Sequence, residues 1–186
     1  MYIDYRYFKS LYGSKGIKEL AGEKPEDEEM TQEEWEEQVF SRLAWDACRR
    51  MDALTTGVDG VRKLKVAFPT DEDDAETVKR CACELVDILY QVKQAEETAK
   101  IASGYVETEN GLQGKVISSV SAGNESISYA VGKSATAETW LDKALSDSAE
   151  LDKKISGTIR EYLSGISDAN GVNLLFMGRY PYRLEK

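Results

Sequence analysis

Residues 114–132 (GKVISSVSAGNESISYAVG) constrain the fold most, because they alternate like strands in a chain whose other periodic segments are helical. If Gly123-Asn124 forms a two-residue turn, Val120 lies opposite Ile127 and the larger apolar side chains share one face. We therefore expect a β-hairpin over residues 114–132. Since a lone two-stranded ribbon is only marginally stable in water, this hairpin needs a surface to lie on, either its own helices or a neighbouring copy of the chain.

Three long segments have the 3.6-residue apolar period of amphipathic helices. They span about Thr31–Leu54, Asp74–Lys100 and Ala137–Leu163. The first begins with Thr31 and Glu34 spaced as a capping box, which is typical of a helix start. The expected fold is mainly α, a small bundle of these three helices with the hairpin inserted between the second and third.

The connecting segments differ in composition. Residues 13–30 are rich in Gly, Lys and Glu and contain Pro25, which predicts an acidic mobile loop. Residues 55–70 predict a turn and a short extended piece, and residues 171–186 an extended C-terminal tail. The length of 186 residues suits a single domain over residues 1–186.

Charge and composition exclude several classes of function. The net charge is −10 and the chain has no histidine, which disfavours an independent nucleic-acid binder and removes the usual general base near neutral pH. No apolar run has the length needed to cross a membrane, and the N-terminus lacks a signal-peptide pattern, so we expect a soluble, non-secreted protein. The three cysteines lie in helical patterns and are expected to be buried, reduced thiols.

An enzyme-like signal comes from Glu84 and Asp87, which place two carboxylates on one helical face and could bind Mg²⁺. With Glu34 and Glu37 on the first helix, they resemble the ExxE and ExxD motifs of the all-α nucleoside-triphosphate pyrophosphatases. The alternative is that these charges are the solvated face of ordinary amphipathic helices.

Large apolar side chains away from the core stripes favour contact with another chain. Trp45 projects from the charged face of the first helix, and the tail contains Phe176, Met177, Tyr180 and Tyr182. The alternative is that these side chains cover each other or the hairpin.

Three features together resemble the small head–tail connector (adaptor) proteins of tailed bacteriophages and prophages. They are the opening YIDYRYFKSLYG, the helix VKRCACELVDILY followed by a loop and ISSVSAGNESISYAVG, and a last helix ending in REYLSG before GVNLLFMGR. The order and spacing of these features run over most of the chain.

The resemblance implies a structural role without catalysis or a cofactor. Such subunits form a ring, usually twelvefold, below the portal of a DNA-filled capsid, extend the DNA channel and dock a stopper or tail completion protein. The family's C-terminal segment engages the portal, and the hairpin would contact neighbouring subunits or the next ring. DNA would pass through the channel without specific binding. The expected location is the virion's head–tail junction, after assembly in the host bacterial cytoplasm.

The residues expected at partner interfaces combine the resemblance with the exposed apolar pattern. They are Trp45, Val116, Ser118, Val120, Ile127, Tyr129, Leu174, Leu175, Phe176, Met177, Arg179, Tyr180 and Tyr182. Two alternatives stay open at this point, a Mg²⁺-dependent pyrophosphatase and a generic helical protein-interaction module.

Overall fold

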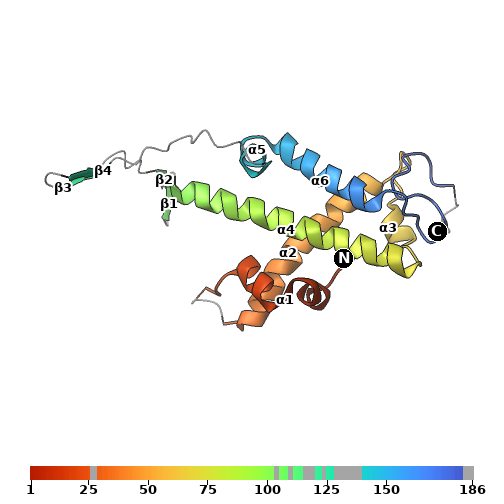
Figure 1. Cartoon of the computed structure of the whole chain (residues 1–186), viewed down its shortest axis with the longest axis horizontal. Helices are drawn as coiled ribbons and strands as arrows, with labels where there is room; N and C mark the ends of the chain where they lie inside the picture. Colours follow the sequence, from red (N-terminus) through yellow and green to blue (C-terminus); the bar gives the residue numbers. More distant parts are fainter. Residues whose placement is uncertain are drawn as a thin grey trace. The chain divides into compact units, whose positions relative to one another are not determined.

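The chain is mainly helical in a computed structural model that describes residues 1–25, 29–102, 105–108, 111–114, 120–122, 125–127 and 140–181 (Figure 1). The elements are α1 (Tyr5–Ala21), α2 (Gln32–Thr55), α3 (Lys63–Val66), α4 (Glu72–Ala102), β1 (Tyr105–Thr108), β2 (Gly111–Gly114), β3 (Val120–Ala122), β4 (Glu125–Ile127), α5 (Trp140–Ser146) and α6 (Ser148–Leu163).

The chain divides into two compact units. Unit 1 comprises Met1–Tyr90 and Asp152–Lys186, and unit 2 comprises Gln91–Leu151. That the two units act as one domain stays a prediction. Among the residues described, no helix combines the length and the apolar character that a membrane span requires.

Helix α2 forms where its sequence signals place it. The Glu34 amide donates to Thr31 Oγ1 at 3.3 Å, and the Thr31 amide donates to Glu34 Oε2 at 2.7 Å, which completes the predicted capping box. Its buried face carries Val39, Phe40, Ala44, Ala47 and Met51, all on the predicted stripe. The capping box and this stripe are therefore confirmed.

Helix α1 was not predicted, and it corrects the expected loop over residues 13–30, because residues 14–21 are helical. Gly13 kinks the helix at φ 71°, a backbone conformation that glycine tolerates, and so interrupts any continuous apolar stripe. Packing holds the helix in place, since Phe8 is buried with its ring 5.1 Å from that of Phe40. The Trp35 indole N–H also donates to the carbonyl of Ala21 at 3.0 Å.

Helix α4 is buried on more sides than a surface helix. Its predicted stripe is confirmed by buried Val78, Cys81, Leu85 and Ile88. Val86 lies off that stripe, and yet it is 0 % exposed. Apolar burial on α4 therefore extends beyond its predicted stripe, while the polar face that carries Arg80 stays exposed. Figure 1 shows α4 crossing α2.

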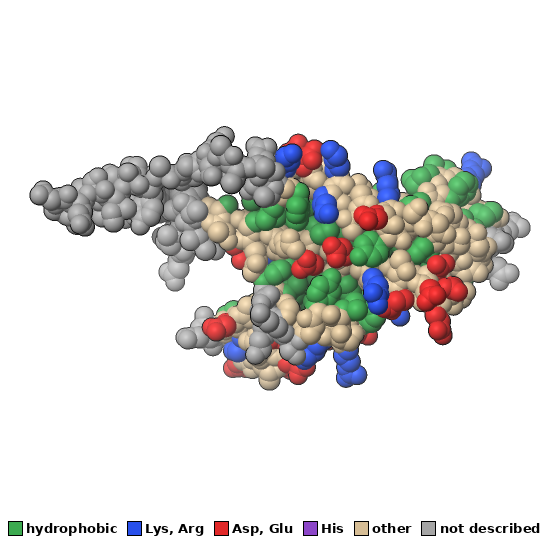
Figure 2. All heavy atoms as spheres, in the orientation of Figure 1, with side chains coloured by type: hydrophobic (Ala, Val, Ile, Leu, Met, Phe, Trp, Pro, Cys, Tyr) green, Lys and Arg blue, Asp and Glu red, His purple; other side chains and the backbone are tan. Residues whose placement is uncertain are grey.

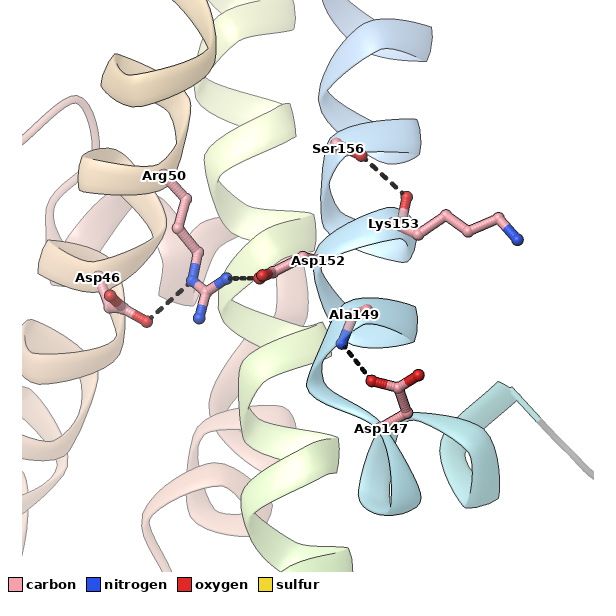
Figure 3. Close-up of polar contacts among 7 residues, drawn as sticks. All are labelled: Asp46, Arg50, Asp147, Ala149, Asp152, Lys153 and Ser156. Carbon is pink, nitrogen blue, oxygen red and sulfur yellow. Dashed lines mark hydrogen bonds and ion pairs between the residues drawn. The ribbon is translucent and has the colours of Figure 1, made fainter.

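The third predicted helix is divided, which corrects the single helix expected over Ala137–Leu163. Helix α5 ends at Ser146, and α6 starts at Ser148. Asp147 separates them and caps α6, because its Oδ1 accepts the Ala149 amide at 2.8 Å (Figure 3). Residues 137–139 lie outside the described residues.

Within unit 1, α2 is tied to its neighbours by polar contacts as well as by apolar packing. Arg50 donates from Nε to Asp46 at 3.2 Å and from Nη1 to Asp152 of α6 at 2.8 Å, so one guanidinium joins α2 to α6 (Figure 3). On its other sides α2 packs against α1 and α3.

The hairpin expected over residues 114–132 is not borne out as one element. Gly114, its expected start, belongs to β2 and lies opposite Tyr105 of β1, because the preceding YVET segment also pairs as a strand. The only part of the predicted hairpin described as paired is β3 with β4, in which Val120 lies opposite Ile127. Residues 115–119, 123–124 and 128–132 lie outside the described residues.

Candidate docking surface

The best-defined polar cluster of unit 1 is centred on the buried ammonium of Lys63, at the start of α3. Its Nζ donates to the carbonyls of Thr55 at 3.1 Å and Leu174 at 3.0 Å, and also to the carbonyl of Phe176. Thr55 is the last residue of α2, where the helix dipole favours a positive charge. The charge of Lys63 therefore joins the end of α2 to a segment that lies more than a hundred residues later.

Burial sets the electrostatics of this lysine. Burial lowers the pKa of Lys63, and the negative charges of Asp168 and Asp59 oppose that effect. The three carbonyl acceptors replace the water molecules that an exposed ammonium would bind. Lys63 is 0 % exposed to solvent and is thus a structural side chain.

Residues 57–61 hold the same C-terminal segment by its backbone. Asp59 Oδ2 accepts the Tyr180 amide at 2.7 Å, and the Val58 amide donates to the Met177 carbonyl at 3.1 Å. A Cβ on Gly57 would lie 2.6 Å from the Gly178 carbonyl oxygen, so only glycine permits this close approach. Hydrogen bonding from the Tyr180 and Val61 amides lowers the pKa of Asp59.

A second anchor lies at Asp168, which is buried. Its Oδ2 accepts the Tyr180 hydroxyl at 2.5 Å, and its Oδ1 accepts the Asn170 and Val172 amides at 2.9 Å each. The Asn170 side-chain amide also donates to the Tyr180 hydroxyl at 2.8 Å. These bonds close the turn that precedes the C-terminal segment and fix Tyr180 at the far end of it.

We call residues 174–179 the docking segment. Leu174 is 0 % exposed, whereas Phe176 and Met177 are 48 % and 52 % exposed. Figure 2 shows hydrophobic side chains at the end of unit 1 where Figure 1 draws α3 and the C-terminal residues. Two large apolar side chains are therefore about half exposed on a backbone that is fixed on both sides, with the Phe176 ring against Gly178 and 5.9 Å from the Lys63 ammonium.

The structure separates the predicted interface residues of the tail into two groups. Phe176, Met177 and Arg179 are exposed. Leu174 and Tyr180 are buried within the chain, which corrects their assignment as partner contacts, and Leu175 is half-buried. The burial has a physical cause, because Leu174 packs in the core while the Tyr180 hydroxyl is bonded to Asp168.

The remaining predicted interface residues are only partly described. Trp45 is 60 % exposed, as predicted, and the Arg49 guanidinium lies 5.6 Å from its ring centroid. Val120 and Ile127 pair in β3 and β4. The other four lie outside the described residues: Val116, Ser118, Tyr129 and Tyr182.

The carboxylates of the alternative magnesium site lie in different settings. Glu34 belongs to the capping box, and hydrogen bonds from Thr31 lower its pKa. Glu84 lines a cleft of about 210 Å³ together with Tyr12, Arg80 and Tyr162. Within the described ranges, no group of three or more Cys, Asp or Glu is placed to hold a metal ion.

Sequence reasoning missed the residues that fix the docking segment. Asp59-Gly60 and the Asp168–Gly171 stretch are typical turn sequences, and Gly60 and Gly171 both have positive φ. The sequence could therefore have predicted these two turns. The role of Lys63 could not be predicted from the sequence, because a lysine in a polar connector is ordinarily exposed. The three cysteines are free and buried, as predicted.

Comparison with known proteins identifies no relative of the chain. No family model matches the chain, and no curated protein and no solved structure matches it.

Proposed function

We propose that the chain is a structural subunit of a phage head–tail connector and that the docking segment is its contact with the portal. The observation that carries the proposal is the exposure of Phe176 and Met177 on a backbone held by Lys63, Asp59 and Val58. The C-terminal position of this segment agrees with the place of the portal contact in the family that the sequence resembles.

The fixed backbone supports a docking role on energetic grounds. Ordering a loop on binding costs free energy, and a segment that is already ordered avoids that cost. Large apolar side chains at the centre of an interface commonly carry most of the binding energy. Phe176 and Met177 combine both properties, so they are the expected anchors of the contact.

The proposed assembly is a ring of identical subunits, usually twelvefold in the family, that extends the DNA channel at the head–tail junction of the virion. Residues 114–132 would contact neighbouring subunits or the next ring, and a stopper or tail completion protein would dock on the far side. The net charge of −10 supports a channel through which DNA passes without binding, because binding requires cations that neutralise phosphates.

The test is binding of the full chain to rings of the portal protein encoded in the same genome. Electron microscopy and co-sedimentation measure this binding. We expect the wild-type chain to decorate the ring and the double variant Phe176→Ser/Met177→Ser to lose binding at least about tenfold. Leu145→Ser is the matched control, since Leu145 is also a large exposed apolar residue, at 38 %, but lies outside the docking segment.

Circular dichroism of the double variant verifies that the helices persist. Binding of the double variant equal to that of the wild type would contradict the assignment of the segment, and a wild-type chain that ignores the portal would contradict the connector role. Capture of a different partner by the docking segment would instead favour the generic interaction module. No observation on the described residues favours the pyrophosphatase.

A further inference from the structure

A cleft of about 680 Å³ lies in unit 1, and its lining is basic although the chain is acidic. It is formed by the first two residues, the second half of α2 and residues 56–65. Arg49, Arg62 and Lys65 line it, and Asp52 is the one carboxylate among its described lining residues. The cleft therefore has a local excess of two positive charges.

The single carboxylate of the cleft is already engaged. Asp52 is 5 % exposed, accepts the Tyr2 hydroxyl, and pairs with Lys65 at 3.4 Å. Burial and the hydrogen bond to Asp52 raise the pKa of Tyr2, so this hydroxyl stays a neutral donor. Arg49 and Arg62 are both exposed and supply the charge that a ligand would meet.

The chemistry of this lining selects carboxylates. A guanidinium binds a carboxylate through two parallel hydrogen bonds, and Arg49 is held over the exposed ring of Trp45. Duplex DNA would need a longer row of cations, since its affinity grows with the number of phosphates neutralised. A short acidic segment of a protein fits a cleft with three cations and one aromatic wall.

The chain itself carries such a segment at the start of α4. Asp71 Oδ1 accepts the amides of Asp73 and Asp74 at 3.1 Å each, which fixes the first turn, and Glu72 and Asp73 are exposed. This segment therefore presents carboxylates without an ordering cost.

The acidic start of α2 is less accessible to a partner than that of α4. At the start of α2, Glu33 pairs with Lys9 at 3.3 Å and Glu34 is held in the capping box. Of these two acidic segments, the start of α4 is the one that has carboxylates to offer a partner.

We propose that the cleft of Arg49, Arg62 and Lys65 binds the acidic start of α4, residues 71–73, from a second copy of the chain. A basic cleft and an acidic helix start on each copy make a contact between two different patches, which is the kind of contact that a ring requires. The proposal deepens the ring assembly proposed above and rests on it, but its test does not involve the portal.

The experiment is sedimentation velocity of the full chain at low and high salt, over a concentration series. We expect association at low salt that weakens as salt screens the charges. Arg49→Glu/Arg62→Glu and, separately, Glu72→Lys/Asp73→Lys should each weaken self-association at least about tenfold. The matched control is Arg6→Glu/Arg42→Glu, which reverses two exposed arginines outside the cleft and should weaken association less.

Mixing the two variants gives the decisive result. The intact acidic segment of one variant meets the intact cleft of the other, so the mixture should associate more strongly than either variant alone. The Trp45 indole N–H resonance should shift on association.

A wild-type chain that stays monomeric at low salt, a cleft variant that associates normally, or a mixture that stays apart would each overturn the proposal. So would binding of polyphosphate to the cleft without any self-association. Portal binding that persists in these cases would leave the connector role standing and remove only this contact.

Discussion

At the scale of single residues, Lys63 shows how a buried charge can order a chain segment. A lone ammonium in an apolar interior is strongly unfavourable, and here three backbone carbonyls surround it. Those carbonyls belong to the end of α2 and to the docking segment, so the same side chain satisfies groups from both. The arrangement makes the docking segment dependent on a residue that is itself fully buried.

We expect Lys63→Met to destabilise the chain by roughly 3 kcal/mol, because it leaves buried carbonyl oxygens without donors. Urea unfolding followed by circular dichroism measures the loss. The control is Lys93→Met, at an exposed lysine of α4, which should change the free energy of unfolding by less than about 0.5 kcal/mol. Equal effects of the two variants would mean that the carbonyl contacts contribute nothing.

A second residue-scale prediction concerns acid. The Tyr180 and Val61 amides bind the charged form of Asp59, with a smaller contribution from Arg179, and hold its pKa below the ordinary 3.8. The folded chain therefore binds this proton more weakly than the unfolded chain, so the contact stabilises above pH 3.8 and is lost as pH falls through the lowered pKa.

The Tyr180 amide resonance should accordingly hold its position on acidification until the pH is below 3.8. Asp59→Asn should abolish this transition. A Tyr180 amide that titrates with a midpoint at or above the ordinary aspartate value would show that the contact does not form in solution.

At the scale of elements, burial of α4 on several sides is the main feature of unit 1. Val78 lies on the stripe that the sequence predicts, and Val86 lies off it, but both are 0 % exposed. On another face, Tyr12 of α1 and Tyr162 of α6 line one cleft with Arg80 and Glu84 of α4.

We expect Val86→Ala to cost about as much as Val78→Ala, roughly 2 kcal/mol each, because both truncations remove buried methyl groups. Val58→Ala is the exposed control, at 75 % exposure, and should be nearly neutral. Thermal or urea unfolding gives all three values. A neutral Val86→Ala would mean that only one face of α4 is packed.

At the scale of the whole molecule, charge limits the partners. The chain carries 24 Lys and Arg against 34 Asp and Glu. The long-range field is therefore negative, and it repels polyanions that approach from solution. The basic cleft at Arg49 and Arg62 is a local exception that salt screens over about 10 Å.

A labelled DNA duplex should accordingly show no change in fluorescence anisotropy when the chain is added at physiological salt. Salt-dependent DNA binding would contradict both the proposed channel role and the choice of carboxylates as ligands of the cleft. In that case Arg49→Glu/Arg62→Glu would show whether the cleft is the site.

The sequence alone determined the features that depend on neighbouring residues. Helix α2 with its capping box, the apolar stripe of α4 and the exposed position of Trp45 all follow from residue spacing and local hydrogen bonds. The same holds for the stripe of α6, where Ile155, Ile159 and Leu163 are buried. The break at Asp147 also has a local cause, but a continuous apolar pattern across it concealed the capping role of the side chain.

Tertiary structure alone decided which distant segments meet. Phe40 holds α1 in place despite the kink at Gly13, and Lys63 selects the carbonyls of Thr55, Leu174 and Phe176. The contact of Lys63 with Thr55 spans 8 residues, and the others span tens to more than a hundred. Their energies depend on burial, which no local pattern encodes. For that reason the exposed apolar pair of the docking segment was visible in the sequence, whereas the charge that holds it in place was not.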